Sequence, residues 1–352
     1  MDRRNFLNPQ QLAKAAGQFL GPVVEDALPA TPAPPAPVEN VALLRFGRRA
    51  MAAQFEVLLP FDAPNALELA EAALDEVHRL EEQLTVFHEH SEVSRLNREA
   101  ASRPVTVEDR LFGLLTLAAR LTQATGGAYD VTTGALTKAW GFYRRQGRVP
   151  TPEERAGAMS RVGMGHVILD AERRSVRFRR AGLEINLGSI GKGYALDRAA
   201  ELLRRATTSA LLHGGQSSVL AVGEIPGDDR GWTVAIRHPF ERDRSLCLVR
   251  LRDRGLATSG AVYQHLEYNG RKLGHILDPR TGWPAEGMAS ASVLAPTAAE
   301  ADALSTAFFI LGVDAARAYC AAHPEIAAVL LPEGADAKLT VINLAAHEVD
   351  CT

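Results

Sequence analysis

A glycine-rich segment that runs from Asn186 to Asp197 has the residue types needed to bind phosphate groups. Lys192 lies among three glycines in this segment, between an apolar stretch typical of a strand and a periodic stretch typical of a helix. Backbone N–H groups left uncovered by small residues at the amino end of a helix, with one ammonium group beside them, form a cradle for phosphate. The order GxxxxGK[ST] of a P-loop is absent. Taken alone, the segment is explained at least as well by a glycine-rich turn with a solvated lysine.

Asp302 and Thr306 lie four positions apart in a second segment, so their oxygens project from one face of a predicted helix. The neighbouring residues are mostly apolar, and a carboxylate there is costly unless a cation or a donor pairs with it. A carboxylate and a hydroxyl are hard oxygen ligands, which suit Mg²⁺ better than zinc. The alternative is a polar stripe on the exposed face of an amphipathic helix.

A third segment, His275 to Gly282, contains an imidazole, a carboxylate and a guanidinium within eight residues. A proline and a glycine in this segment predict a fixed turn, which places Asp278 and Arg280 on a loop, where binding groups are common. His275, at the end of a predicted strand, could act as a general base or hold a phosphate. A turn closed by a salt bridge explains the same residues.

The elements that position these segments can be predicted from periodicity and turn signals. Strands and helices are mixed without regular βαβ alternation, which indicates an α+β fold or a complex α/β layer fold. The predicted strands are Val41 to Phe46, Gln54 to Pro60, His166 to Asp170, Ser175 to Arg179, Ala210 to His213, Val219 to Val222, Trp232 to Ile236, Leu246 to Leu251 and Ile326 to Leu331, and Asn269-Gly270 predicts a hairpin turn. The first predicted helix begins at a capping box of Asn65 and Glu68. The next two run from about Asp109 to Thr125 and from about Tyr194 to Arg205. The last begins at a capping box of Thr297 and Glu300 and ends at Leu311.

The composition is that of a soluble globular chain, with 352 residues, 46% of them apolar and 23% charged. A formal net charge of −3 argues against nucleic-acid binding as the main task. Because no run of 18 apolar residues occurs, we expect no membrane span. Cys247, Cys320 and Cys351 lack CxxC spacing, which argues against a disulfide framework and against a thiolate zinc site.

The amino terminus, Met1 to Leu7, resembles a twin-arginine export signal. Polar residues interrupt the apolar stretch that should follow, so a short amphipathic helix is the alternative. With an export signal the protein would be periplasmic or membrane-associated, and without one it would be cytoplasmic. Five prolines between Pro29 and Pro37 predict an extended linker. We therefore expect residues 1–40 to form a leader and linker and residues 41–352 to form the folded domain.

In this order, the motifs resemble those of the FAD:protein FMN transferases, the ApbE-type flavin transferases, from about Phe46 to Leu331. The matching segments are Arg49-Ala-Met51 with Phe55-Glu56, Ser91 to Asn97, Thr125 to Asp130, Trp140-Gly-Phe142, Leu187-Gly188 with Gly191 to Ala195 and Asp197, Gly214-Gly215, Ala257 to Gly260, His275 to Gly282, and Ala301 to Thr306. The most specific match is His-Ile-Leu-Asp-Pro-Arg-Thr-Gly followed by Asp-Ala-Leu-Ser-Thr. The resemblance implies a single catalytic unit with a mixed-sheet layered fold of the ApbE or T-fold-like type.

The resemblance also implies an enzyme that binds FAD and Mg²⁺ and attaches FMN to a threonine or serine hydroxyl of a target protein, such as a membrane redox subunit, releasing AMP. In such a reaction Asp302 would hold Mg²⁺, Lys192 would face the phosphates, and His275 would orient or deprotonate the incoming hydroxyl. The positions that match FAD contacts are Met51, Ala128, Tyr129, Asp130, Asn186, Lys192 and His275, and those that match metal ligands are Ser189, Asp302 and Thr306.

Several positions depart from the family pattern, and three of them lose a carboxylate. The usual Met-Gly-Thr reads Met51-Ala52-Ala53, the usual Asp-Leu-Gly-Gly reads Asn186-Leu-Gly-Ser189, the usual Gly-Gly-Asp reads Gly214-Gly215-Gln216, and Ala261 stands where an acidic residue follows Thr-Ser-Gly. Alanine and glutamine cannot act as bases, and fewer carboxylates could weaken Mg²⁺ binding. The alternative function is therefore a non-catalytic FAD-binding module derived from this family, and a third is a scaffold that binds no flavin.

Overall fold

The structure, a computed structural model, describes residues 41–144, 147–241, 243–261, 265–268 and 270–351. The expected leader and proline-rich linker lie outside these described residues. The described residues belong to one compact unit, and the fold below is the fold of this unit.

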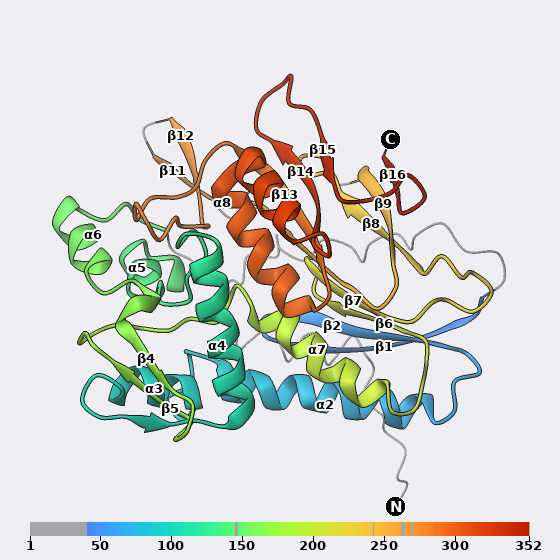
Figure 1. Ribbon diagram of the computed structural model, residues 1–352, viewed down its shortest axis with the longest axis horizontal. Helices are drawn as coiled ribbons and strands as arrows, with labels where there is room; N and C mark the ends of the chain where they lie inside the picture. The colour runs from blue at the N-terminus through green and yellow to red at the C-terminus, as the bar shows by residue number, and fades with distance from the viewer. Residues whose placement is uncertain (1–40, 145–146, 242, 262–264, 269, 352) are drawn as a thin grey trace, which may run out of the picture. The chain divides into compact units, whose positions relative to one another are not determined.

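An eight-stranded sheet forms the centre of the domain (Figure 1). Its strand order is β1-β2-β6-β7-β10-β13-β14-β15, and each of these neighbouring pairs is antiparallel. Together with the helices, this sheet confirms the predicted α+β class. The strands are β1 (Leu43–Ala50), β2 (Ala53–Pro60), β6 (Ala210–Gly214), β7 (Ser218–Val222), β10 (Gly255–Ser259), β13 (Met288–Ala295), β14 (Ala327–Pro332) and β15 (Thr340–Ile342).

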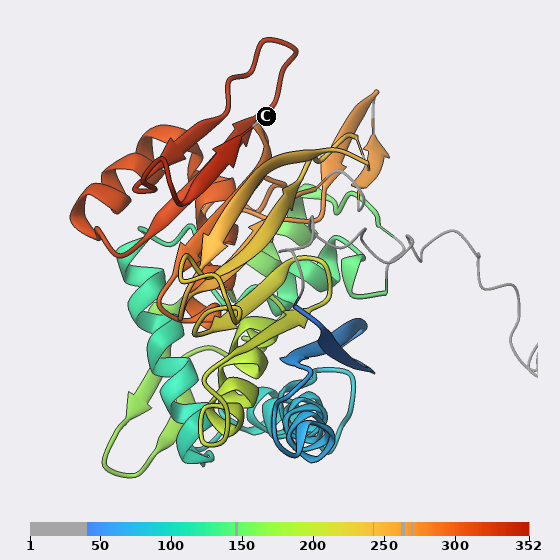
Figure 2. The same cartoon turned by 90° about the vertical axis from the view of Figure 1, so that its right-hand side faces the viewer.

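Helices cover one face of this sheet (Figures 1 and 2). Strand residues that point to this face, such as Val57 and Leu212, share a core with the helices. Because successive strand residues point to opposite faces, their neighbours Leu58 and Leu211 lie in a separate core on the other side. The helices on the first face are α2 (Ala66–Leu84), α7 (Gly191–Leu203) and α8 (Ala298–Ala322), and α4 (Asp109–Ala124) packs beside α8.

A small three-stranded sheet covers the other face, with the order β16-β9-β8. A disulfide joins Cys247 to Cys351 in this sheet, whereas Cys320 is free and buried. The sequence argument against disulfides was therefore wrong for this pair. The two residues are 104 positions apart, and only the pairing of β9 with β16 brings them together. The strands are β8 (Trp232–Arg237), β9 (Ser245–Leu251) and β16 (Val349–Cys351).

The remaining elements form a lobe beside the helical layer. Leu136 and Trp140 pack there against Leu273 and Leu277, which holds the segment after His275 in place. The elements are α3 (Glu92–Glu99), α5 (Gly134–Ala139), α6 (Pro152–Met159), the 3₁₀ turns η1 (Phe142–Arg144) and η2 (Met164–His166), a sheet of β3 (Val105–Thr106), β5 (Ser175–Phe178) and β4 (Val167–Asp170), and a hairpin of β11 (His265–Tyr268) and β12 (Arg271–Gly274).

Three helix boundaries differ from the sequence prediction. Asn65 adopts a left-handed conformation, with φ of 52°, and its side chain makes no cap hydrogen bond, so the predicted first capping box is wrong. α7 begins at Gly191 and not near Tyr194, because contacts with α8 outweigh the low helix propensity of its glycines. α8 resumes after a break at Gly312, close to its predicted end, whereas its predicted Thr297 cap is confirmed by a hydrogen bond from the Glu300 N–H.

α8 is long and apolar enough to cross a bilayer, judged by length and composition alone. The described contacts place it instead against β10, β13 and β14, with Phe308 and Phe309 buried in the core. We therefore interpret it as a core helix.

Candidate active site

The amino end of α7 presents Lys192 and a set of backbone N–H groups. The Asn186 side-chain oxygen accepts a hydrogen bond from the Gly188 N–H at 2.9 Å, which tightens the turn before the helix. Lys192 and Gly193 then lie in the first turn of α7, where N–H groups have no partner within the helix and favour an anion. The Gly193 N–H donates to the Asp302 carboxylate at 3.0 Å. The segment therefore contains a helix amino end, as predicted, and the anion that its Gly193 N–H contacts in the structure is the Asp302 carboxylate.

Asp302 is a buried carboxylate, only 5% exposed, on the second turn of α8. Its Oδ2 accepts from the Gly193 N–H and lies 3.6 Å from the Lys192 Nζ, and its Oδ1 accepts from the Ser218 hydroxyl at 3.3 Å. These partners offset the desolvation of the charge. The alternative of an exposed polar stripe is thus wrong for Asp302, and Lys192 is paired with a carboxylate.

Three hydroxyl groups lie beside Asp302. Thr306 Oγ1 donates to the Asp302 main-chain carbonyl at 3.4 Å. The Ser259 hydroxyl lies 2.9 Å from that of Ser305 and 3.3 Å from that of Thr306. Each hydroxyl keeps acceptor lone pairs after donating its proton. The end of β10 and one face of α8 therefore form an oxygen-rich patch.

Tyr129 extends this cluster from the loop that follows α4. Its ring is 1% exposed, and burial raises the pKa of the phenol well above its ordinary value. Asp302 raises the pKa further, while the Ser189 hydroxyl lies close enough to lower it. Among the described residues, the phenol oxygen is nevertheless left without a full hydrogen bond. A buried donor in this state is suited to a ligand that supplies an acceptor.

The neighbours of Tyr129 serve the loop itself. The Asp130 carboxylate accepts from the Thr132 N–H and hydroxyl at 2.8 and 2.6 Å, and from the Met164 N–H at 2.8 Å. Ala128 is completely buried. The Asp130 carboxylate therefore already accepts three hydrogen bonds from within the protein.

Met51 lies at the tip of the β1–β2 hairpin. Its φ is 50° and that of Ala52 is 56°, a left-handed pair typical of a tight hairpin turn. The Met51 N–H donates to Glu81 Oε1 on α2 at 2.7 Å. Glycine, the usual residue at position 52, takes this conformation without strain, and Ala52 does not.

His275 follows β12 directly and is partly buried. The residues that follow form a turn, in which the Asp278 carboxylate accepts from the Arg280 backbone N–H and guanidinium at 2.7 to 2.9 Å. The predicted alternative of a turn closed by a salt bridge is thus confirmed for this part of the segment. A Cβ placed on Gly274 would lie 2.5 Å from the Ala261 Cβ. Residue 261, where the family has an acid, therefore lies beside the strand end that carries His275.

The contacts unite five of the predicted site residues, namely Lys192, Asp302, Thr306, Tyr129 and Ser189. Sequence reasoning missed Ser218 and Ser305, which are both completely buried. The available signal was their position, because Ser218 follows Gly214-Gly215 closely and Ser305 lies between Asp302 and Thr306.

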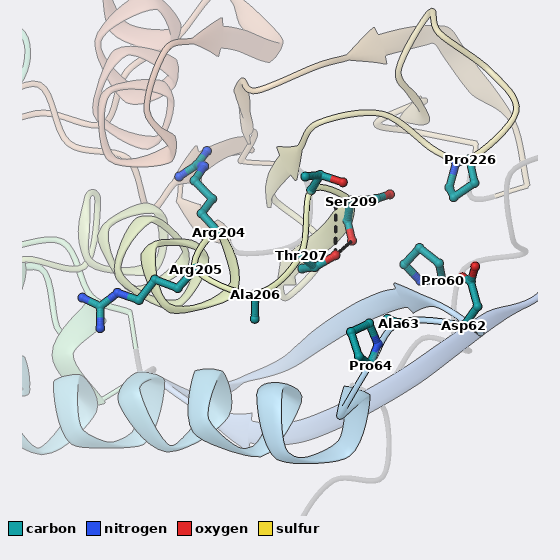
Figure 3. Close-up of a pocket in the computed structure, with 11 residues that line it drawn as sticks. Pro60, Asp62, Ala63, Pro64, Arg204, Arg205, Ala206, Thr207, Ser209 and Pro226 are labelled. Atoms are coloured by element: carbon teal, nitrogen blue, oxygen red, sulfur yellow. Dashed lines mark hydrogen bonds between the residues drawn. The ribbon is translucent and has the colours of Figure 1, made fainter.

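A pocket of about 510 Å³ lies elsewhere, between the β2–α2 loop and the carboxyl end of α7 (Figure 3). None of the eleven residues drawn around it belongs to the predicted site. Figure 3 shows the guanidinium groups of Arg204 and Arg205 directed away from the prolines on the opposite wall. We therefore assign the chemistry to the place where Lys192 and Gly193 of α7 meet Asp302 of α8, which we call the α7–α8 junction, and not to this pocket.

A family model described as the ApbE family matches residues 51–330. The chain belongs to the ApbE family. An FAD:protein FMN transferase of Treponema pallidum is 34% identical over 279 residues, which cover 74% of this chain and 77% of the relative. An FAD:protein FMN transferase of Klebsiella pneumoniae is 32% identical over 253 residues, covering 70% and 71%.

Solved structures of ApbE proteins have the same fold. The ApbE protein of Thermotoga maritima superimposes with a TM-score of 0.78 at 28% identity, over 86% of this chain and 97% of that one. The apo form of the Pseudomonas stutzeri flavinyl transferase ApbE gives 0.76 at 26% identity, over 87% and 96%. The layered fold expected from the motifs is thereby confirmed, and the chain is an enzyme of the flavin transferase class.

Proposed function

We propose that this ApbE protein transfers FMN from FAD to a threonine or serine hydroxyl of an acceptor protein, in a Mg²⁺-dependent reaction that releases AMP. The observation that carries the proposal is the α7–α8 junction, where the Lys192 ammonium and the Gly193 N–H meet the buried Asp302 carboxylate. The names of the relatives supply the substrate class.

The donor set at the junction fits Mg²⁺. Within the described residues, no group of three His, Cys, Asp or Glu side chains could hold a metal, so a zinc-type site is not expected there. Mg²⁺ is commonly held by one or two carboxylates and by substrate phosphates. Asp302 would supply the carboxylate, and Thr306 and Ser189 would supply hydroxyl oxygens. Bound there, Mg²⁺ would neutralise charge on the phosphate oxygens.

The residues of the chain divide the remaining work. In the transfer, the acceptor oxygen forms a bond with the phosphorus on the FMN side of the pyrophosphate, and the bond from that phosphorus to the bridging oxygen breaks, so AMP leaves with the bond electrons. Lys192 would stabilise charge on the phosphate oxygens. His275 would orient the acceptor hydroxyl and take its proton. The buried phenol of Tyr129 would donate to a flavin nucleotide oxygen.

The test is covalent flavin transfer to an acceptor domain, measured by intact mass with FAD and Mg²⁺ present. Asp302→Asn should abolish the mass increase of one FMN, because a neutral amide cannot replace the carboxylate. Asp314→Asn is the matched control, since Asp314 is an exposed carboxylate on the same helix. Transfer at the wild-type rate by Asp302→Asn would refute the placement of the metal.

The competing function is a flavin-binding module without activity. Its support is the absence of the usual family carboxylates at positions 186, 216 and 261. The Gln216 side-chain oxygen accepts from Arg237 at 3.1 Å, so its amide is used within the protein, and Ala261 has no ionisable group. Binding of FAD without any transfer, by a chain whose secondary structure is intact, would establish this second function.

We further propose that the protein is exported and acts on an acceptor outside the cytoplasm, such as a membrane redox subunit. The Cys247–Cys351 disulfide supports this proposal, because disulfides persist mainly in oxidising compartments. Detection of the protein in cell fractions is the direct test. A purely cytoplasmic location with both cysteines reduced would contradict it.

A further inference from the structure

α7 and α8 begin beside each other, and each helix supplies a carboxylate to the amino end of the other. Asp197, on α7, accepts from the Ala298 N–H at 2.8 Å and from the Ala299 N–H at 2.9 Å. Asp302, on α8, accepts from the Gly193 N–H at 3.0 Å. Figure 1 shows an end of α8 meeting an end of α7 in front of the sheet. The two amino ends are therefore joined by reciprocal carboxylate caps.

The first turn of α8 is also tightly packed on two sides. A Cβ on Gly193 would lie 2.1 Å from the Ala298 carbonyl oxygen. A Cβ on Gly255, at the start of β10, would lie 2.5 Å from the Ala298 Cα. Backbone thus contacts backbone on both sides, and α8 cannot shift without moving the amino end of α7.

Asp197 is not required to start α8. Thr297 already caps the helix, because its hydroxyl accepts from the Glu300 N–H at 3.1 Å and also lies 3.1 Å from Glu300 Oε2. Asp197 instead binds the first two N–H groups from outside the helix. Its hydrogen bonds determine where α8 lies relative to α7.

We propose that Asp197 is a positioning residue, which holds the first turn of α8 against α7 so that the Asp302 carboxylate meets Lys192 in the geometry that binds the metal ion. This inference rests on the proposed function, in which Asp302 holds Mg²⁺. Asp197 lies one helical turn after Gly193, the residue whose N–H binds Asp302. Its effect on the metal would pass through Ala298 and Ala299.

The test is Mg²⁺ binding to the purified full chain, measured by calorimetry without FAD, and the Mg²⁺ concentration for half-maximal transfer. Asp197→Asn keeps the shape of the side chain, but its amide nitrogen cannot accept from an N–H. We expect its Mg²⁺ dissociation constant to rise about tenfold, the effect of about 1.4 kcal/mol of lost positioning. The KM for FAD should change much less.

Thr297→Ala is the matched control, because it removes the other cap from the same turn of α8. It should lower thermal stability while leaving the Mg²⁺ dissociation constant within about twofold of the wild type. If Asp197→Asn does not fold, the same measurement is made on Asp197→Ser, because the shorter serine side chain buries no amide group.

Unchanged Mg²⁺ binding in the Asp197 variants, or equal weakening in Thr297→Ala, would overturn the positioning role and leave the proposed function intact. A wild-type chain whose Mg²⁺ binding does not depend on Asp302 would overturn both.

Discussion

Replacement of Gly193 by alanine should disrupt the α7–α8 junction. The added Cβ would lie 2.1 Å from the Ala298 oxygen, so the two backbones would have to separate by about 0.9 Å to reach the 3.0 Å below which such contacts are essentially not seen. The same movement would weaken the 3.0 Å hydrogen bond between the Gly193 N–H and Asp302. Overpacking of this kind costs about 1–3 kcal/mol, and loss of a hydrogen bond to a charged group costs about 1.5–3 kcal/mol.

We therefore expect the free energy of unfolding of Gly193→Ala to fall by roughly 2.5–6 kcal/mol, measured by urea denaturation. Flavin transfer should fall about 100-fold, because a displacement of this size misplaces Asp302. Gly191→Ala is the matched control in the same helical turn. A Cβ at position 191 has no neighbour within 4 Å. The higher helix propensity of alanine should therefore stabilise the chain by up to about 1 kcal/mol.

The reasoning would be refuted if the two alanine variants unfolded at the same urea concentration. It would also fail if Gly193→Ala were destabilised but transferred flavin at the wild-type rate, because the junction would then have no part in positioning Asp302.

Three further predictions concern stability. Ala52→Gly should raise the free energy of unfolding by about 1 kcal/mol, because φ at this position is 56°, and a thermal melt that shows no increase would contradict the strain. Burial lowers the pKa of His213 to about 4 from 6.5, so its contribution to stability is complete above pH 6.5 and is lost as the pH falls towards 4; His213→Gln should show a flatter pH dependence in urea titrations. Cys351→Ser should lower the free energy of unfolding by about 2–5 kcal/mol, because the disulfide with Cys247 closes a long loop, and its melting temperature, unlike that of the wild type, should not respond to a reductant.

The sequence predicted the site best where local rules were enough. The apolar neighbours of Asp302 indicated a carboxylate that needs a partner, and the structure supplies Lys192, Gly193 and Ser218. The Thr297 cap was predicted because its partner, Glu300, is three residues away. Such signals depend on spacing along one helix.

The partners that come from distant segments could not be predicted in this way. Asp197 contacts Ala298 across 101 positions, and Cys247 meets Cys351 across 104. No periodicity connects these residues, because their distance is set by the order of strands in the sheet. Asn65 failed for a different reason, since its side chain could have capped α2 only with another backbone conformation.

The separation of the two caps along the chain also bears on when activity arises during synthesis. Gly193 and Asp302 are 109 positions apart, and β6, β7, β10 and β13 are all made between them. A nascent chain that ends before α8 has no carboxylate to place beside Lys192. Contacts of such long range form late in folding. The protein should therefore acquire its catalytic geometry only when nearly the whole domain has been made, so that prematurely terminated chains would be inert towards the flavin nucleotide.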